Sequence, residues 1–121
     1  MSSTMVYLLV ACGGGIGALL RFCLVQMVAF PYGTLSVNVI GSFLMGLAFA
    51  YFAGRLSEIA PLFLMAGIFG GFTTFSAFSL DLLKLLDIGR FGFALTYLCG
   101  SVFGALAAVF LGFIAMRAVS A

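Results

Sequence analysis

The fold of this chain is decided by the stretch Met65–Asp81, which reads MAGIFGGFTTFSAFSLD. It is apolar enough to lie within a membrane-spanning helix, but Gly70 and Gly71, followed by the β-branched Thr73 and Thr74, weaken a helix there. A broken helix is tolerated at membrane depth only where its released backbone groups meet protein, water or an ion. Two interpretations remain open at this stage: a helix broken in this stretch, or an unbroken helix whose glycines serve packing.

Aromatic and hydroxyl side chains alternate directly after this weak point. Phe75 and Phe78 lie about one turn apart, and Ser76 and Ser79 lie beside them. A phenyl ring is electron-rich on its face and relatively positive at its edge, so ring edges and hydroxyl donors together can accommodate a small anion. The alternative is that these rings face lipid or the core, as is usual in a chain with 15 phenylalanines.

Outside this stretch the composition excludes a soluble globule. Of 121 residues, 65% are hydrophobic and only 7% are charged, whereas a soluble domain keeps about a quarter of its residues charged. Four apolar segments are each long enough to span a bilayer, at about 4–28, 34–53, 61–83 and 91–116. We therefore predict an all-α, multi-pass protein of the cell (inner) membrane, with one transmembrane domain over residues 1–121, lipid around it and no nucleic-acid partner. A cleaved signal peptide is the disfavoured alternative for the first segment, because no basic region precedes it.

Positive charge is nearly balanced across the predicted membrane. Arg55 and Arg117 lie on the side of the termini, and Lys84 and Arg90 lie on the opposite side, with Arg21 near the end of the first span. Lys and Arg in short loops normally fix orientation. A balance this close predicts that copies insert both ways and can form an antiparallel homodimer, although chance can also produce it.

Small residues recur at four-residue spacing in three of the spans. They form the pairs Gly13–Gly17 and Gly67–Gly71, and the stripe Gly100, Gly104, Ala108 and Gly112. Such stripes let helix backbones approach closely in lipid. Each pair can serve packing within one subunit, and the longer stripe also suggests contact between subunits.

Polar side chains at membrane depth are costly and therefore informative. Thr34 and Asn38 share one face of the second span, and Tyr97 and Ser101 share one face of the fourth. They can form a polar track or make isolated interhelical hydrogen bonds. Arg21 can attract anions at the mouth of a pathway or extend its charge to the nearer interface.

No catalytic constellation is apparent, so an enzyme is not expected. His is absent, and three cysteines without CxxC spacing indicate neither a disulfide framework nor a metal site. A small four-helix multidrug exporter is one alternative, but proton-coupled exchange needs a carboxylate deep in a span. Glu58, Asp81 and Asp87 are expected in or near loops, which argues against it. A non-transporting scaffold subunit is the other alternative.

Three motifs together resemble the Fluc/CrcB fluoride channel family, and the resemblance covers essentially the whole chain. They are Gly14-x-x-Gly17-x-x-x-Arg21, Gly33-Thr34-Leu35-x-x-Asn38-x-x-Gly41, and Gly70-Gly71-Phe72-Thr73-Thr74-Phe75-Ser76-Ala77-Phe78-Ser79. The last is similar to a highly specific family signature. The resemblance implies passive fluoride export by an antiparallel, dual-topology homodimer with two pathways at the subunit interface.

The resemblance also implies residue roles. A central structural sodium ion would be held by the backbone carbonyls of Gly70 and Thr73. Phe75 and Phe78 match the phenylalanines that contact fluoride edge-on. The remaining matches are Asn38, a pore-lining position; Tyr97 and Ser101, polar positions of the fourth helix; and Arg21, in the vestibule.

Three positions depart from the family pattern. Ala77 stands where Thr or Ser is usual, Asp81 where Glu is common, and Ala105 where some relatives have a hydroxyl. A polar track shortened in this way affects the conduction rate more than the selectivity.

Overall fold

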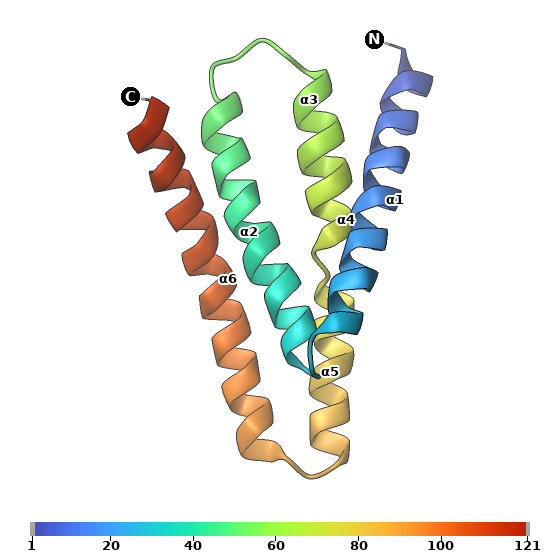
Figure 1. Ribbon diagram of the computed structural model, residues 1–121, viewed down its shortest axis with the longest axis vertical. Helices are drawn as coiled ribbons and strands as arrows, with labels where there is room; N and C mark the ends of the chain where they lie inside the picture. The colour runs from blue at the N-terminus through green and yellow to red at the C-terminus, as the bar shows by residue number, and fades with distance from the viewer. Residues whose placement is uncertain (1, 121) are drawn as a thin grey trace.

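The computed structural model describes residues 2–120, and these residues form helices joined by short connections (Figure 1). The elements are α1 (Ser3–Met27), α2 (Tyr32–Phe52), α3 (Ile59–Pro61), the π-helical segment η1 (Leu62–Phe69), α4 (Gly70–Phe72), α5 (Phe75–Asp87) and α6 (Phe91–Ser120). Four helical stretches are long and apolar enough to cross a membrane: Ser3–Met27, Tyr32–Phe52, Ile59–Asp87 and Phe91–Ser120. The prediction of an all-α membrane protein with four spans is confirmed. The third and fourth stretches run a few residues further than the sequence suggested.

The third span is interrupted at Thr73 and Thr74. Both residues have extended backbones, with φ −87° and ψ 154° at Thr73 and φ −154° and ψ 119° at Thr74. Gly70 and Gly71 remain helical in α4, so the break follows the glycines and falls on the β-branched pair. Of the two interpretations left open by the sequence, the broken helix is correct.

Glycines bring the helices together in two close pairs. α1 lies along η1 and α4, and α2 lies along α6 (Figure 1). A Cβ placed on Gly17 would meet the backbone of Ile68 and Phe72, and one on Gly112 would meet the backbone of Phe43 and Leu47. These positions admit only glycine without separating the backbones.

The small-residue patterns therefore serve packing inside the subunit at most of their positions. Gly13 faces Gly67, and Gly71 faces Gly14. On α6, Gly112 packs closely on α2, and Ala108 of the same stripe is buried. At the other end of the stripe, a Cβ on Gly100 would have no heavy atom within 4 Å. Only the Gly100 end of the stripe lacks a neighbour within the described chain.

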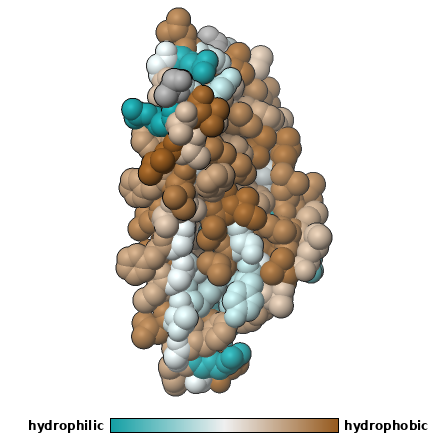
Figure 2. All heavy atoms as spheres, turned by 60° about the vertical axis from the view of Figure 1, so that its left-hand side comes forward, coloured by the Kyte–Doolittle hydropathy of each residue, from teal (hydrophilic) through white to brown (hydrophobic). Residues whose placement is uncertain are grey.

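The face drawn in Figure 2 is mostly apolar, with its most hydrophilic residues near the two ends and residues of intermediate hydropathy in the lower half. Both termini lie at one end, together with the α2–α3 connection, and the α5–α6 connection lies at the other (Figure 1). Four cations near these ends each lie over an aromatic ring: Arg55 over Tyr51, Lys84 over Phe30, Arg90 over Phe93 and Arg117 over Phe113. Such pairs suit the membrane–water boundary, where a ring can remain in the apolar layer while the charge meets water.

Candidate functional site

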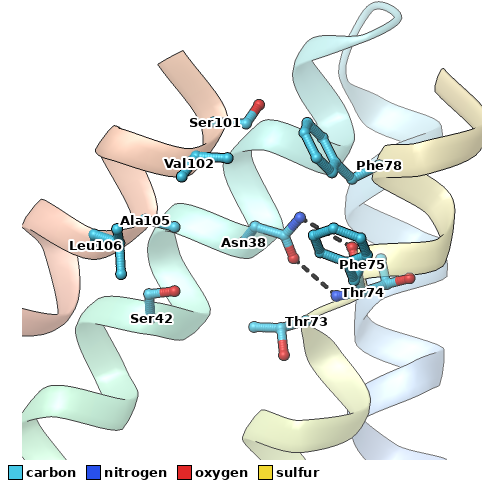
Figure 3. Close-up of a pocket in the computed structure, with 10 residues that line it drawn as sticks. All are labelled: Asn38, Ser42, Thr73, Thr74, Phe75, Phe78, Ser101, Val102, Ala105 and Leu106. Carbon is cyan, nitrogen blue, oxygen red and sulfur yellow. Dashed lines mark hydrogen bonds between the residues drawn. The ribbon is translucent and has the colours of Figure 1, made fainter. Parts of the chain in front are cut away.

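A pocket of about 330 Å³ opens where the third span is broken (Figure 3). Its wall comes from α2, from the break and the start of α5, and from α6. The lining residues are Asn38, Ser42, Thr73, Thr74, Phe75, Phe78, Ser101, Val102, Ala105 and Leu106. The structure thus brings together Asn38, Phe75, Phe78 and Ser101, four of the residues predicted for the pathway.

Asn38 is hydrogen-bonded to the break by both ends of its side-chain amide. Its Nδ2 donates to the Thr74 carbonyl at 3.1 Å, and its Oδ1 accepts from the Thr74 N–H at 2.8 Å (Figure 3). Thr74 is also the N-cap of α5, because its Oγ1 accepts from the Ala77 N–H at 3.0 Å. The second half of the span therefore begins at a position fixed by α2.

Phe75 and Phe78 form an edge-to-face pair beside the pocket. Their ring centroids are 5.5 Å apart at an interplanar angle of 64°. Phe78 is 4% exposed and belongs to the core, whereas Phe75 is 77% exposed in the single chain. Both rings line the pocket, but only Phe78 is fixed by packing in the core of the subunit.

Behind Phe78 lies a buried polar group that joins α5 to α6. The Phe78 and Tyr97 ring centroids are 5.3 Å apart, and the Tyr97 hydroxyl donates to Asp81 Oδ2 at 3.0 Å. Ser101, one turn after Tyr97, is 5% exposed, and its Oγ has no hydrogen-bond partner among residues 2–120. Ser101 also lines a second pocket, of about 190 Å³, together with Tyr97 and Thr96.

Three other predicted pathway residues are placed differently. Thr34 is buried and lines neither pocket. Ser76 and Ser79 are exposed on α5 and lie outside the lining of both pockets. The Ser79 hydroxyl donates to the Phe75 carbonyl at 2.9 Å, and the Ser76 hydroxyl lies 3.2 Å from Thr74 Oγ1.

The expectation that Asp81 lies in or near a loop is wrong. It sits inside α5, is 7% exposed, and is held by Tyr97. The sequence showed only its closeness to charged residues. It did not show that α5 continues to Asp87, which places Asp81 well before the helix end. The argument against an exporter from the absence of a deep carboxylate therefore loses its basis.

Sequence reasoning also left out two polar residues of the pocket wall, Ser42 and Thr74. Ser42 follows Asn38 by one helical turn, a spacing that already indicates a shared face. Thr74 was noted only as a helix-weakening residue, whereas its backbone is the hydrogen-bonding partner of Asn38. Only the folded chain brings that peptide group against α2.

Arg21 reaches the same break from α1. Its Nε donates to the Gly71 carbonyl at 3.1 Å, and the side chain is half-buried. Gly13, Gly17 and Arg21 follow one another at four-residue spacing, so the face of α1 that packs on the third span also carries this guanidinium.

The break leaves backbone carbonyls available at Gly70 and Thr73. A continuous helix would direct the N–H groups of Thr74 and Ala77 to these two carbonyls. Here Thr74 N–H is bonded to Asn38 Oδ1 and Ala77 N–H to Thr74 Oγ1. Neutral carbonyl oxygens of this kind suit a hard cation. Within residues 2–120 no group of three or more His, Cys, Asp or Glu side chains is placed to hold a metal ion.

These features define a class: a small multi-pass membrane protein whose interrupted helix opens onto a pocket lined by two phenylalanine rings and several polar side chains. Residues 8–113 match the family described as CrcB-like protein, Camphor Resistance (CrcB), and the chain belongs to that family.

Curated relatives are similar over nearly their whole length. A fluoride-specific ion channel FluC of Rhodopseudomonas palustris is 48% identical, covering 96% of this chain and all of the relative. Proteins of the same name from Thermus thermophilus and Mesorhizobium japonicum are 49% and 50% identical, covering 88% and 87% of this chain and 91% and 90% of their own lengths.

Proposed function

We propose that this protein is a fluoride-selective channel that carries the anion passively out of the cytoplasm. The observation that carries the proposal is the pocket at the helix break, in a chain of the CrcB family. Its lining includes Phe75, Phe78 and Ser101, whose hydroxyl has no hydrogen-bond partner among residues 2–120. Hydrogen fluoride is a weak acid that crosses membranes uncharged and ionises inside at higher pH. A channel for the anion therefore relieves fluoride trapping without an energy source.

Fluoride leaves water only if other donors replace its hydration shell. Phe75 and Phe78 supply positive ring edges, and the Ser101 hydroxyl supplies a hydrogen-bond donor that no other group within residues 2–120 uses. The first turn of α5 adds backbone N–H groups, and the positive end of its helix dipole faces the same region. None of these groups carries a full positive charge, so the ion is held weakly enough to leave. Asn38, Thr34, Tyr97, Ser76 and Ser79 complete the proposed pathway.

The proposed assembly is an antiparallel homodimer with two pathways at its interface. Phe75 is large, apolar and 77% exposed beside the pocket, and Gly70 is exposed next to the break. A second copy that covers this face closes the open side of the pocket and shields the anion from lipid. Copies inserted in opposite orientations bring their two breaks together on the symmetry axis.

The proposed dimer holds one structural sodium ion on that axis. Each copy contributes the carbonyl oxygens of Gly70 and Thr73, whose helical donors are bonded elsewhere. Two such pairs form a compact, neutral cage, which suits a monovalent cation better than a divalent one that needs more ligands and carboxylates. The ion compensates carbonyls that would otherwise be costly to leave unsatisfied in the membrane.

Fluoride flux from liposomes tests the function directly. Purified protein is reconstituted into vesicles loaded with potassium fluoride, and efflux is followed with a fluoride electrode after valinomycin is added. A fluoride channel gives fast fluoride efflux without a proton gradient, and little chloride efflux from matched chloride-loaded vesicles followed with a chloride electrode. A proton-coupled exporter gives no efflux under these conditions, and a scaffold subunit gives none under any gradient.

A further inference from the structure

We propose that Arg21 and Asn38 act as a brace on the two sides of the helix break: they are positioning residues that fix the direction of its backbone carbonyls. This inference rests on the proposed function, because it concerns the carbonyls assigned there to sodium. The two side chains come from different helices, α1 and α2, and end on neighbouring peptide groups of the third span. Both are half-buried.

Within the described chain, the side-chain amide of Asn38 forms its hydrogen bonds with the backbone of Thr74. Its amide pairs with both the N–H and the carbonyl of Thr74, at 2.8 and 3.1 Å, in the manner of a neighbouring strand. The bond from the Thr74 N–H fixes the plane of the Thr73–Thr74 peptide group, and the bond to the Thr74 carbonyl fixes the next peptide group, Thr74–Phe75. The Thr73 carbonyl, which immediately precedes the Thr74 N–H, takes its direction from the Thr73–Thr74 peptide plane.

Arg21 holds the other side of the break. The last four carbonyls of a helix have no helical donor, and here these belong to Gly70, Gly71, Phe72 and Thr73. Arg21 Nε occupies the Gly71 carbonyl at 3.1 Å. With the Gly71 carbonyl bonded to the guanidinium, the carbonyls of Gly70, Phe72 and Thr73 remain without a helical donor, and Gly70 and Thr73 are the pair assigned above to sodium. The position of Arg21 is secured by Gly17, one turn earlier, which packs directly on the backbone of Ile68 and Phe72.

Arg21→Lys separates this role from simple attraction of anions. The substitution keeps the positive charge, but a lysine methylene stands where the arginine Nε–H was, so it has no donor at that position. Arg55→Lys is the matched control, because Arg55 Nε also donates to a backbone carbonyl, that of Tyr51, outside the pocket. Asn38→Leu removes both hydrogen bonds of the side-chain amide while keeping a side chain of similar volume. Ser36→Ala, on the same helix, is its control. The Ser36 hydroxyl bonds only Tyr32 of its own helix.

The measurement is the sodium dependence of thermal unfolding in detergent, with N-methylglucamine as the replacement cation. We expect Arg21→Lys and Asn38→Leu to raise the half-saturating sodium concentration by about tenfold, the size expected from losing one charge-assisted or two neutral hydrogen bonds. Saturating sodium should recover most of the lost stability. The two control variants should follow the wild-type curve. Variant curves that superimpose on the wild-type curve overturn the brace.

Amide hydrogen exchange on the wild-type protein provides a test that needs neither sodium nor a variant. Thr74 N–H lies at a break yet is bonded to Asn38, whereas Phe75 and Ser76 occupy the first turn of α5, where N–H groups lack helical acceptors. We expect Thr74 to exchange at least about tenfold more slowly than Phe75 and Ser76. Equal exchange at the three amides overturns the brace. A wild-type protein indifferent to sodium, with Thr74 still protected, contradicts the sodium part of the proposed function and leaves the brace standing.

Discussion

Phe75 and Phe78 belong to one sequence motif, but the fold treats the two rings differently. Phe78 is packed against Tyr97 in the core, and Phe75 is largely exposed in the single chain. A ring that is already buried contributes to the stability of the subunit, whereas an exposed ring beside a pocket can contribute only to what occupies or covers that pocket. The functional and structural roles of the pair can therefore be separated by substitution.

Replacing either ring with isoleucine keeps apolar bulk but removes the positive edge. We expect Phe75→Ile and Phe78→Ile each to lower fluoride efflux from liposomes by about fivefold, since an aromatic edge contact contributes on the order of 1 kcal/mol. Only Phe78→Ile should also lower the free energy of unfolding, by about 1–3 kcal/mol for a reshaped core position. Phe22→Ile, on the exposed side of α1, is the control. Efflux at the wild-type rate from both pathway variants would rule out the aromatic-edge mechanism.

The buried Asp81 depends on a single described donor, the Tyr97 hydroxyl. Tyr97→Phe keeps the ring against Phe78 but leaves the carboxyl group without that bond. We expect a loss of about 1–3 kcal/mol in the free energy of unfolding, the cost of an unsatisfied buried polar group. Adding Asp81→Asn to this variant should recover part of the loss, because a neutral amide is less costly to bury.

A double-mutant cycle from thermal unfolding measures this coupling. Tyr51→Phe, at a partly exposed ring over which Arg55 lies, serves as the control and should change stability little. Additive effects of Tyr97→Phe and Asp81→Asn would show that the hydrogen bond contributes nothing to the stability of the subunit.

At the scale of whole elements, the four spans were predictable because their signal is distributed over twenty or more apolar residues each. The break was only one of two open interpretations. Gly70-Gly71 and Thr73-Thr74 both weaken a helix, and local propensity does not say which pair yields. The structure places the break at the threonines because Asn38 satisfies the Thr74 peptide group and Thr74 caps α5. Asn38 lies far from Thr74 in the sequence, and the cap that Thr74 forms on α5 exists only once the helix is broken.

The candidate site shows the same limit. Asn38, Phe75, Phe78 and Ser101 were predicted from motifs, and they meet at one pocket. The burial of Asp81 was not predictable from its neighbours in sequence, since it depends on where α5 ends and on Tyr97 from α6. Likewise, the spacing of Gly13 and Gly17 indicated close packing but could not name η1 and α4 as the partner.

The packing of α1 on the third span gives a prediction at this scale. A Cβ at Gly17 would overlap the backbone of Ile68, so Gly17→Ala must push α1 away from the segment that carries the break. We expect a loss of about 1–3 kcal/mol in the free energy of unfolding from this overpacking. Gly15→Ala, two residues away, meets nothing within 4 Å and should be neutral or stabilising by up to about 1 kcal/mol. The comparison is made by thermal unfolding, and equal effects at the two glycines would contradict the packing described for α1.

For the molecule as a whole, orientation depends on where its cations lie. Arg55 lies in the α2–α3 connection and Arg117 in the last turn of α6, and these elements are at the end that carries the termini (Figure 1). Lys84 lies in the last turn of α5 and Arg90 in the α5–α6 connection, at the other end. Each of these four stacks on a ring near its end of the molecule. Arg21 is bonded to the Gly71 carbonyl inside the bundle, so it does not act as a loop charge. The loop cations are then balanced, and the positive-inside rule gives no preferred orientation.

Breaking this balance is the test of antiparallel assembly. Two or three lysines added near Ser120 should place the end with the termini in the cytoplasm in every copy. If the functional unit needs two opposed copies, this protein alone should give no fluoride efflux, because parallel copies cannot bring their breaks together on one axis within the membrane plane. Co-expression with a copy biased the other way, by Asp87→Lys at the end of α5 and Ile88→Lys in the α5–α6 connection, should restore efflux. The biased copies must also be checked for insertion by cysteine accessibility at the α2–α3 connection. Efflux at the wild-type rate from copies shown to share one orientation would exclude an obligate antiparallel dimer. If co-expression does not restore efflux, the added charges themselves, and not the orientation, cause the loss.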